Sequence, residues 1–168
     1  NLNNMITESE MVEFLEKAKE CNFNSVVVSP TYVTLAKETL KDTNIKVGSV
    51  IGFPLGFEDT NGKVAEAKSL LDKGVDEFEV VINLSHLKDE NYKLLENEIK
   101  QIKETIGDKI LKVIIETCYL NEEEIGKLTD ICNETYVNFI KTSTGYGTRG
   151  VSLDDIDIAQ EEFKKVYC

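Results

Sequence analysis

The chain has 168 residues, of which 41% are hydrophobic and 30% charged, a balance typical of one folded globular domain rather than of a disordered or fibrous protein. Its formal net charge of −12 argues against binding to nucleic acid or to an anionic membrane surface. No apolar run approaches the roughly 20 residues of a membrane-spanning helix, and the first residues lack the basic and apolar regions of a signal peptide. We therefore expect a cytoplasmic protein in which residues 1–168 form a single domain.

Residue types that bind metals are sparse. The four cysteines include no Cys-x-x-Cys pair, and the single histidine, His86, has no partner histidine. A zinc site would therefore lack ligands, and we expect no metal. The cysteines are expected to be buried free thiols in a reducing compartment; they are Cys21, Cys118, Cys132 and Cys168.

Two hydrophobic periodicities alternate along the chain. A capping box at residues 7–10 precedes apolar residues at helical spacing, which predicts a helix to about residue 20. Further helices are expected at residues 32–40, 62–73, 91–106 and 121–134, and a last one starts at residues 152–155 and carries Ile156, Ala159 and Phe163. Short β-prone runs predict strands at residues 25–29, 46–53, 77–83, 110–116 and 137–143. This alternation predicts an α/β fold with a parallel sheet, but it does not distinguish an open sheet from a barrel.

Three of the predicted strands carry charged side chains on one face. Residues two apart along a strand point to the same face of a sheet. The charged faces hold Glu77, Glu79, Val81 and Asn83 in one strand, Lys112, Ile114 and Glu116 in the next, and Phe139, Lys141 and Ser143 in the last. We expect these three faces to converge on the same side of the sheet.

Two lysines and one glutamate on these faces form a candidate catalytic group. Neighbouring strands lie about 4.8 Å apart, so Lys112 and Lys141 are expected side by side, with Glu79 one strand further along. Adjacent ammonium groups disfavour each other's charge, and partial burial acts in the same direction, so one lysine is expected to be neutral near pH 7. A neutral lysine attacks a carbonyl carbon to form a Schiff base, and a nearby carboxylic acid can shuttle protons. The strand pattern alone supports a structural ion network equally well.

The turn that follows Lys141 favours a binding site over such a network. Hydroxyl groups and free backbone N–H groups at the carboxyl end of a parallel strand are where α/β folds bind ligands. The candidate substrate-binding residues are Thr142, Ser143, Thr144 and Gly145.

A glycine motif at residues 145–150 offers an alternative function. Its spacing is formally that of the G-x-G-x-x-G fingerprint of dinucleotide-binding proteins, with glycines at Gly145, Gly147 and Gly150. That fingerprint requires a second strand after the following helix, ending in an acidic residue about 20 residues on. Here the sequence ends within or just after that helix, so a dinucleotide-binding protein is the weaker interpretation.

Four motifs in the same order resemble the deoxyribose-phosphate aldolases, a family of class I, Schiff-base-forming aldolases. They lie at residues 50–56, 74–83 with Leu87 and Lys88 following, 111–117 and 139–145, and the likeness runs from about residue 7 to the end. The resemblance implies a (β/α)8 barrel of the TIM type that needs no metal and no organic cofactor. It also implies reversible cleavage of 2-deoxy-D-ribose 5-phosphate to D-glyceraldehyde 3-phosphate and acetaldehyde.

The resemblance assigns roles by position. Lys141 matches the Schiff-base lysine of the family, and Lys112 matches the neighbouring lysine that keeps it deprotonated. Glu79 stands where the family has a proton-relay aspartate, so the acid is kept but reaches one methylene further.

Parts of the family pattern have no counterpart in these residues. The last two βα units are missing, with a second active-site lysine and most of the phosphate-binding loops, and residues 1–6 match the first strand only faintly. We expect an incomplete barrel of about five of eight strands, whose open edges self-association into a homo-oligomer would cover. A non-catalytic, self-associating partial barrel is thus a second alternative, and the sequence leaves open whether it is a piece of a longer chain.

Overall fold

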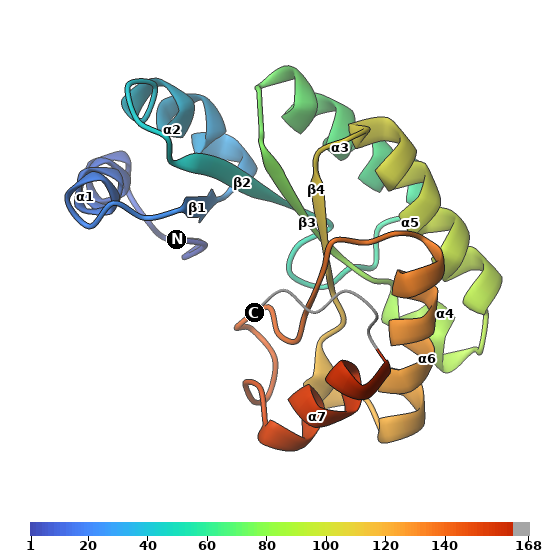
Figure 1. Cartoon of the computed structure of the whole chain (residues 1–168). Coiled ribbons are helices and arrows are strands. Elements are labelled where there is room, and N and C mark those ends of the chain that lie inside the picture. The colour runs from blue at the N-terminus through green and yellow to red at the C-terminus, as the bar shows by residue number, and fades with distance from the viewer. Residues whose placement is uncertain (163–168) are drawn as a thin grey trace.

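The computed structural model of the chain describes residues 1–162 (Figure 1). The strands are β1 (Ser25–Val28), β2 (Lys46–Ile51), β3 (Glu77–Val81), β4 (Ile110–Ile114) and β5 (Phe139–Lys141). The helices are α1 (Glu8–Glu20), α2 (Val33–Thr39), α3 (Thr60–Asp72), α4 (Leu84–Lys88), α5 (Tyr92–Ile106), α6 (Glu122–Glu134) and α7 (Leu153–Glu162), with 3₁₀ turns η1 (Pro30–Tyr32) and η2 (Thr117–Tyr119). Phe163 and Cys168 lie outside the described residues.

The five strands form one parallel sheet in the order β1-β2-β3-β4-β5. Consecutive strands are therefore neighbours, and a helix connects each to the next, which confirms the predicted α/β fold with a parallel sheet. Helices α3, α5 and α6 lie along one side of β3 and β4 (Figure 1). On that side the sheet contributes Phe78, Val80, Leu111 and Val113 to the hydrophobic core.

The helix starts follow the local sequence signals. Thr7 accepts a hydrogen bond from the backbone of Glu10 while Glu10 bonds back to Thr7, and Asn121 and Glu124 do the same at α6. Each box satisfies N–H groups that the first helical turn leaves free.

The strands are shorter than the sequence pattern predicts. β4 ends at Ile114 and β5 at Lys141, each two residues before the expected end. Glu116 takes a left-handed backbone conformation, with φ 51°, which turns the chain away from the sheet. The pattern also missed α4, since five residues are too few to display a helical period.

A fully buried ion pair joins α3 to α5. The Lys63 ammonium lies 2.8 Å from Glu98 Oε1, and the two side chains are 0% and 2% exposed. Lys63 also donates to the backbone carbonyl of Val81, the last residue of β3, at 2.8 Å. The pair therefore links two outer helices to the strand that carries Glu79.

The thiols differ in exposure. Cys132 is buried as expected, whereas Cys118 is only partly buried and Cys21 is exposed, so the expectation of buried thiols is wrong for Cys21. Cys21 directly follows α1, at a helix end that faces solvent.

Among the described residues, no helix has both the length and the apolar character needed to cross a membrane.

Candidate active site

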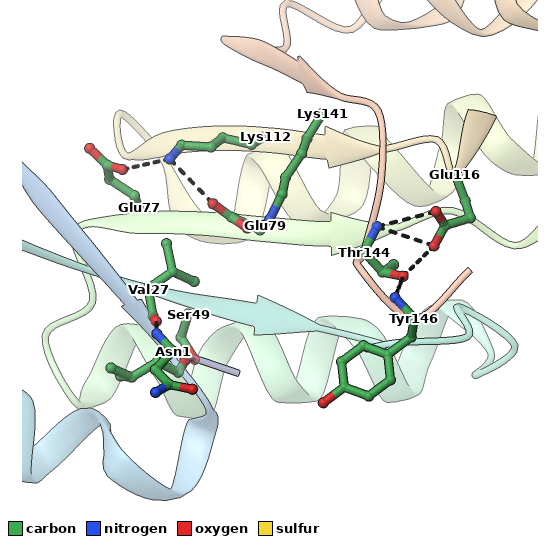
Figure 2. Close-up of polar contacts among 11 residues, drawn as sticks. Asn1, Val27, Ser49, Glu77, Glu79, Lys112, Glu116, Lys141, Thr144 and Tyr146 are labelled. Atoms are coloured by element: carbon green, nitrogen blue, oxygen red, sulfur yellow. Dashed lines mark hydrogen bonds and ion pairs between the residues drawn. The ribbon is translucent and has the colours of Figure 1, made fainter. Parts of the chain in front are cut away.

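Glu79 lies between the two candidate lysines on the face of the sheet away from α3, α5 and α6 (Figure 2). Its Oε2 is 2.8 Å from Lys141 Nζ, and its Oε1 is 3.3 Å from Lys112 Nζ. The three side chains come from β5, β4 and β3, as the alternation of faces predicts. The structure thus brings Lys112, Lys141 and Glu79 together.

The register of the strands places the lysines on a diagonal rather than side by side. Lys112 pairs with Phe139, and Lys141 pairs with Ile114, two residues nearer the carboxyl end of the sheet. Glu79 pairs with Lys112. The expectation that the two lysines lie side by side is therefore wrong, and the carboxylate of Glu79 contacts both ammonium groups.

Glu77 is a fourth charged member of the cluster, to which sequence reasoning gave a face but no role. Its Oε2 lies 2.8 Å from Lys112 Nζ, closer than Glu79 does. The exposed fractions of the side chains are 4% for Glu77, 3% for Glu79, 19% for Lys112 and 37% for Lys141. Only register and side-chain direction, which the pattern does not specify, reveal that Glu77 reaches Lys112.

The electrostatics of Lys112 favour its charged form. Burial alone would lower the pKa of Lys112, but the hydrogen bond that Lys112 donates to Glu77 and the charges of Glu79 and Glu77 outweigh it, so the pKa is raised. The ammonium also lies 5.9 Å from the centroid of the Phe139 ring, which further suits a cation. Lys112 therefore does not fit the expectation of a lysine that is neutral near pH 7.

The turn after Lys141 is held in place by Glu116. Both oxygens of this buried carboxylate accept the backbone N–H of Thr144 at 3.2 Å, and the Thr144 hydroxyl donates to it as well. The Thr144 oxygen in turn accepts from the N–H of Tyr146 at 3.0 Å (Figure 2). Both donors of Thr144 thus point into the protein, whereas Thr142 and Ser143 bond to each other at 3.2 Å and are partly exposed. The sequence analysis placed Glu116 on the charged face of its strand but did not predict this role. An acidic residue at the end of a predicted strand was the available signal.

Aromatic side chains from two distant loops meet near the carboxyl ends of the strands. Phe53, after β2, packs edge to face on Tyr146, after β5, with ring centroids 5.6 Å apart. Since β2 and β5 are not neighbours in the sheet, this contact requires the sheet to curl. Both rings line a cavity of about 540 Å³, together with Ser29, Val50 and Glu66. Its volume is in the range of small-molecule sites.

The glycine motif does not form a nucleotide-binding turn. Arg149 within it is bound by Asp155 through two contacts, of 2.6 and 3.0 Å, and this holds the pKa of Asp155 far below its usual range despite burial. The first turn of α7 carries Asp154 and Asp155. Carboxylates at a helix N-terminus oppose a pyrophosphate there, so the dinucleotide interpretation is not favoured.

Comparison with known proteins agrees with this geometry. The sequence profile described as "DeoC/LacD family aldolase" matches residues 1–168. The chain belongs to this aldolase family. It is 47% identical over 150 residues to deoxyribose-phosphate aldolase from Clostridioides difficile (strain 630), covering 89% of this chain and 68% of the relative. It is 42% identical over 161 residues to the enzyme of the same name from Metamycoplasma hominis, covering 96% and 74%.

Solved structures of aldolases share the fold. "QR15, an Aldolase" superimposes with a TM-score of 0.92 at 40% identity, over 96% of this chain and 72% of that one. A tetrameric deoxyribose phosphate aldolase from Aeropyrum pernix gives 0.86 at 26% identity, over 98% and 69%. The fold is therefore the TIM-type barrel of this family, of which the described residues hold five strands, as the sequence resemblance implied.

Proposed function

We propose that this chain carries the reaction of the deoxyribose-phosphate aldolases: reversible cleavage of 2-deoxy-D-ribose 5-phosphate to D-glyceraldehyde 3-phosphate and acetaldehyde. Family membership and the names of the relatives support the reaction. The observation that carries the mechanism is the 2.8 Å contact between Lys141 Nζ and the buried Glu79 carboxylate.

Lys141 is the proposed nucleophile, and Glu79 its proton acceptor and donor. Glu79 takes a proton from the Lys141 ammonium, and the free amine attacks the aldehyde carbon of the sugar. Glu79 then returns the proton to the departing hydroxyl, so water leaves and a protonated imine forms. Since the other oxygen of Glu79 faces Lys112, the acid stays aimed at Lys141 throughout.

The imine then accepts the electrons of the breaking bond. Glu79, again a carboxylate, takes the proton of the C3 hydroxyl; the C2–C3 bond breaks, its electron pair moves toward the imine nitrogen, and glyceraldehyde 3-phosphate leaves. The enamine left on Lys141 is protonated at carbon, and water releases acetaldehyde. Glu79 is the proposed proton donor to carbon, because it is the carboxyl group in contact with Lys141.

The turn at residues 142–145 is the proposed contact surface for the sugar. Thr142, Ser143 and Gly145 are the parts of the turn at least partly open to solvent, while Thr144 holds the turn against Glu116. The proposed partners are thus a small phosphorylated sugar and acetaldehyde.

A homo-oligomer is also proposed, on the precedent of the tetrameric Aeropyrum pernix relative. The exposed thiol of Cys21 fits a reducing location such as the cytoplasm.

Trapping of the imine tests the proposal. The chain is incubated with acetaldehyde or deoxyribose 5-phosphate, reduced with borohydride and analysed by peptide mass spectrometry. We expect one stoichiometric label on Lys141, absent in Lys141→Met and reduced in Lys112→Met. Lys17→Met, which alters an exposed lysine on α1, is the control and should label normally. Labels scattered over surface lysines, or none, would refute the assignment and favour the non-catalytic partial barrel.

A further inference from the structure

Glu77 is a buried carboxylate at the start of β3 that the proposed reaction does not use. Its nearest cation is Lys112, at 2.8 Å, and Lys46 on β2 is more distant, at 4.0 Å, with a side chain that is 46% exposed. Burying a carboxylate is unfavourable unless a partner compensates its charge. In Figure 2 the Lys112 side chain extends toward Glu77 and away from Lys141. Glu77 therefore determines where the Lys112 charge lies.

Four alternating charges form a chain on this face: Glu77, Lys112, Glu79 and Lys141. At rest they sum to zero. When the Lys141 proton moves to Glu79, that pair becomes neutral, and the Glu77–Lys112 pair remains balanced on its own. Two further basic groups among the described residues lie near these carboxylates: Lys46, at 4.0 Å from Glu77, and the amino group of Asn1, which interacts with Glu79 and whose pKa is lowered by burial.

Without Glu77, the same proton transfer would leave Lys112 uncompensated. Glu79 would then be the only carboxylate in contact with two ammonium groups, and protonating it would leave a buried cation without a partner. With both carboxylates present, Glu77 neutralises Lys112 and Glu79 exchanges protons with Lys141. Without Glu77, Glu79 would have to do both.

We propose that Glu77 is a positioning residue that holds the Lys112 ammonium and so leaves Glu79 free to exchange a proton with Lys141. This inference rests on the proposed function, because it assumes that Lys141 reacts as an amine. Glu77 itself touches neither substrate nor reacting atoms; it acts through Lys112.

The test is the pH dependence of the imine-trapping rate with acetaldehyde. Removing a buried negative charge makes every neighbouring proton more acidic, so Glu77→Gln should move the whole rate profile to lower pH, by about one unit. Lys112→Met removes a positive charge and should move the profile to higher pH. The double variant Glu77→Gln/Lys112→Met removes a neutral pair, and its profile should return close to that of the parent chain. Glu77→Asp, which keeps the charge, should stay nearest the parent.

A purely structural role for Glu77 predicts a different result. Glu77→Gln would then lower the amount of folded, labelled protein at every pH without moving the profile, and that outcome would overturn the proposal. Glu98→Gln is the matched control, since it also removes a buried carboxylate from an ion pair but lies outside the cluster; its profile should not move. If Glu77→Gln does not fold, two variants still decide the matter: Lys112→Met should move the profile to higher pH, and the double variant should bring it back to that of the parent chain.

A second readout separates this inference from the proposed function. In the unreacted chain, ¹³C-lysine NMR titration follows Lys112 directly, and Glu77→Gln should lower its titration midpoint by a similar amount. If the parent chain forms no imine at Lys141, the proposed function is refuted. If the titration midpoint of Lys112 is unchanged in Glu77→Gln, the inference that Glu77 holds the Lys112 ammonium is refuted.

Discussion

Replacing Lys63 by methionine tests how much the buried ion pair between α3 and α5 stabilises the fold. The methionine side chain is similar in volume, so the change removes charge and hydrogen bonds without opening a large cavity. Removing one partner of a buried pair costs about 3–5 kcal/mol, because the other charge is left uncompensated. Lys63→Met leaves Glu98 in that state, and it also removes the donor to the Val81 carbonyl. A loss of this size is a large part of the roughly 5–15 kcal/mol that stabilises a typical domain.

The loss should depend on pH in a definite direction. The pKa of Glu98 is already raised, because burial outweighs the opposing charge of Lys63. In Lys63→Met that charge is gone, so the pKa rises further. A raised pKa means that the folded state holds a proton that the unfolded state releases, so stability falls as pH rises above the ordinary glutamate value near 4.5. The deficit of the variant should therefore be largest above pH 7 and shrink toward pH 5.

Denaturant unfolding followed by circular dichroism at pH 8 and pH 5 measures this deficit. Lys17→Met removes an exposed ion pair with Glu20 and should cost less than about 1 kcal/mol at either pH. The double variant Lys63→Met/Glu98→Leu replaces both charges by apolar groups and should recover most of the loss. A deficit for Lys63→Met below about 1 kcal/mol, or one equal at both pH values, would refute the reasoning.

Two further predictions concern the thiols and the turn. Burial raises the pKa of Cys132 to about 12, so a thiol reagent mapped by mass spectrometry should modify Cys21 in the folded chain and Cys132 only after unfolding; equal rates at both would contradict the burial of Cys132. Glu116→Gln weakens the acceptor of both Thr144 donors and should destabilise the chain by about 1–3 kcal/mol in denaturant unfolding, with Glu122→Gln on the exposed start of α6 as the unaffected control. An unchanged midpoint for Glu116→Gln would show that the turn does not depend on this carboxylate.

Local signals in the sequence were sufficient for much of the fold. The capping boxes at Thr7 and Asn121 predicted two helix starts, because a cap depends on residues only three positions apart. Strand alternation placed Glu79, Lys112 and Lys141 on one face. The same pattern predicted ends for β4 and β5 that are two residues too late, because apolar and β-prone residues continue past the observed ends. The left-handed turn at Glu116 has no signal in the hydrophobic pattern.

Long-range partners could not be read in the same way. Lys63 and Glu98 lie 35 residues apart on different helices, and either could have been a solvent-exposed charge. The diagonal between Lys112 and Lys141 depends on the register of β4 against β5, which is fixed by packing. The contact between Glu77 and Lys112 likewise depends on the register of β3 against β4, in which Glu77 pairs with Ile110 and Glu79 with Lys112.

The exposure of the four charges bears on whether they form a structural network or a reactive site. Glu77 and Glu79 are almost completely buried, and Lys112 is mostly buried, but Lys141 at the end of the chain of charges is more than a third exposed. A network that served only to stabilise the sheet would gain most by excluding water from every member, because exposed ion pairs contribute little. Here the member left open is the lysine nearest the carboxyl end of the strands, next to the turn at residues 142–145. A small aldehyde can reach Lys141 while Glu77, Glu79 and Lys112 stay shielded from water, and this asymmetry favours the reactive site.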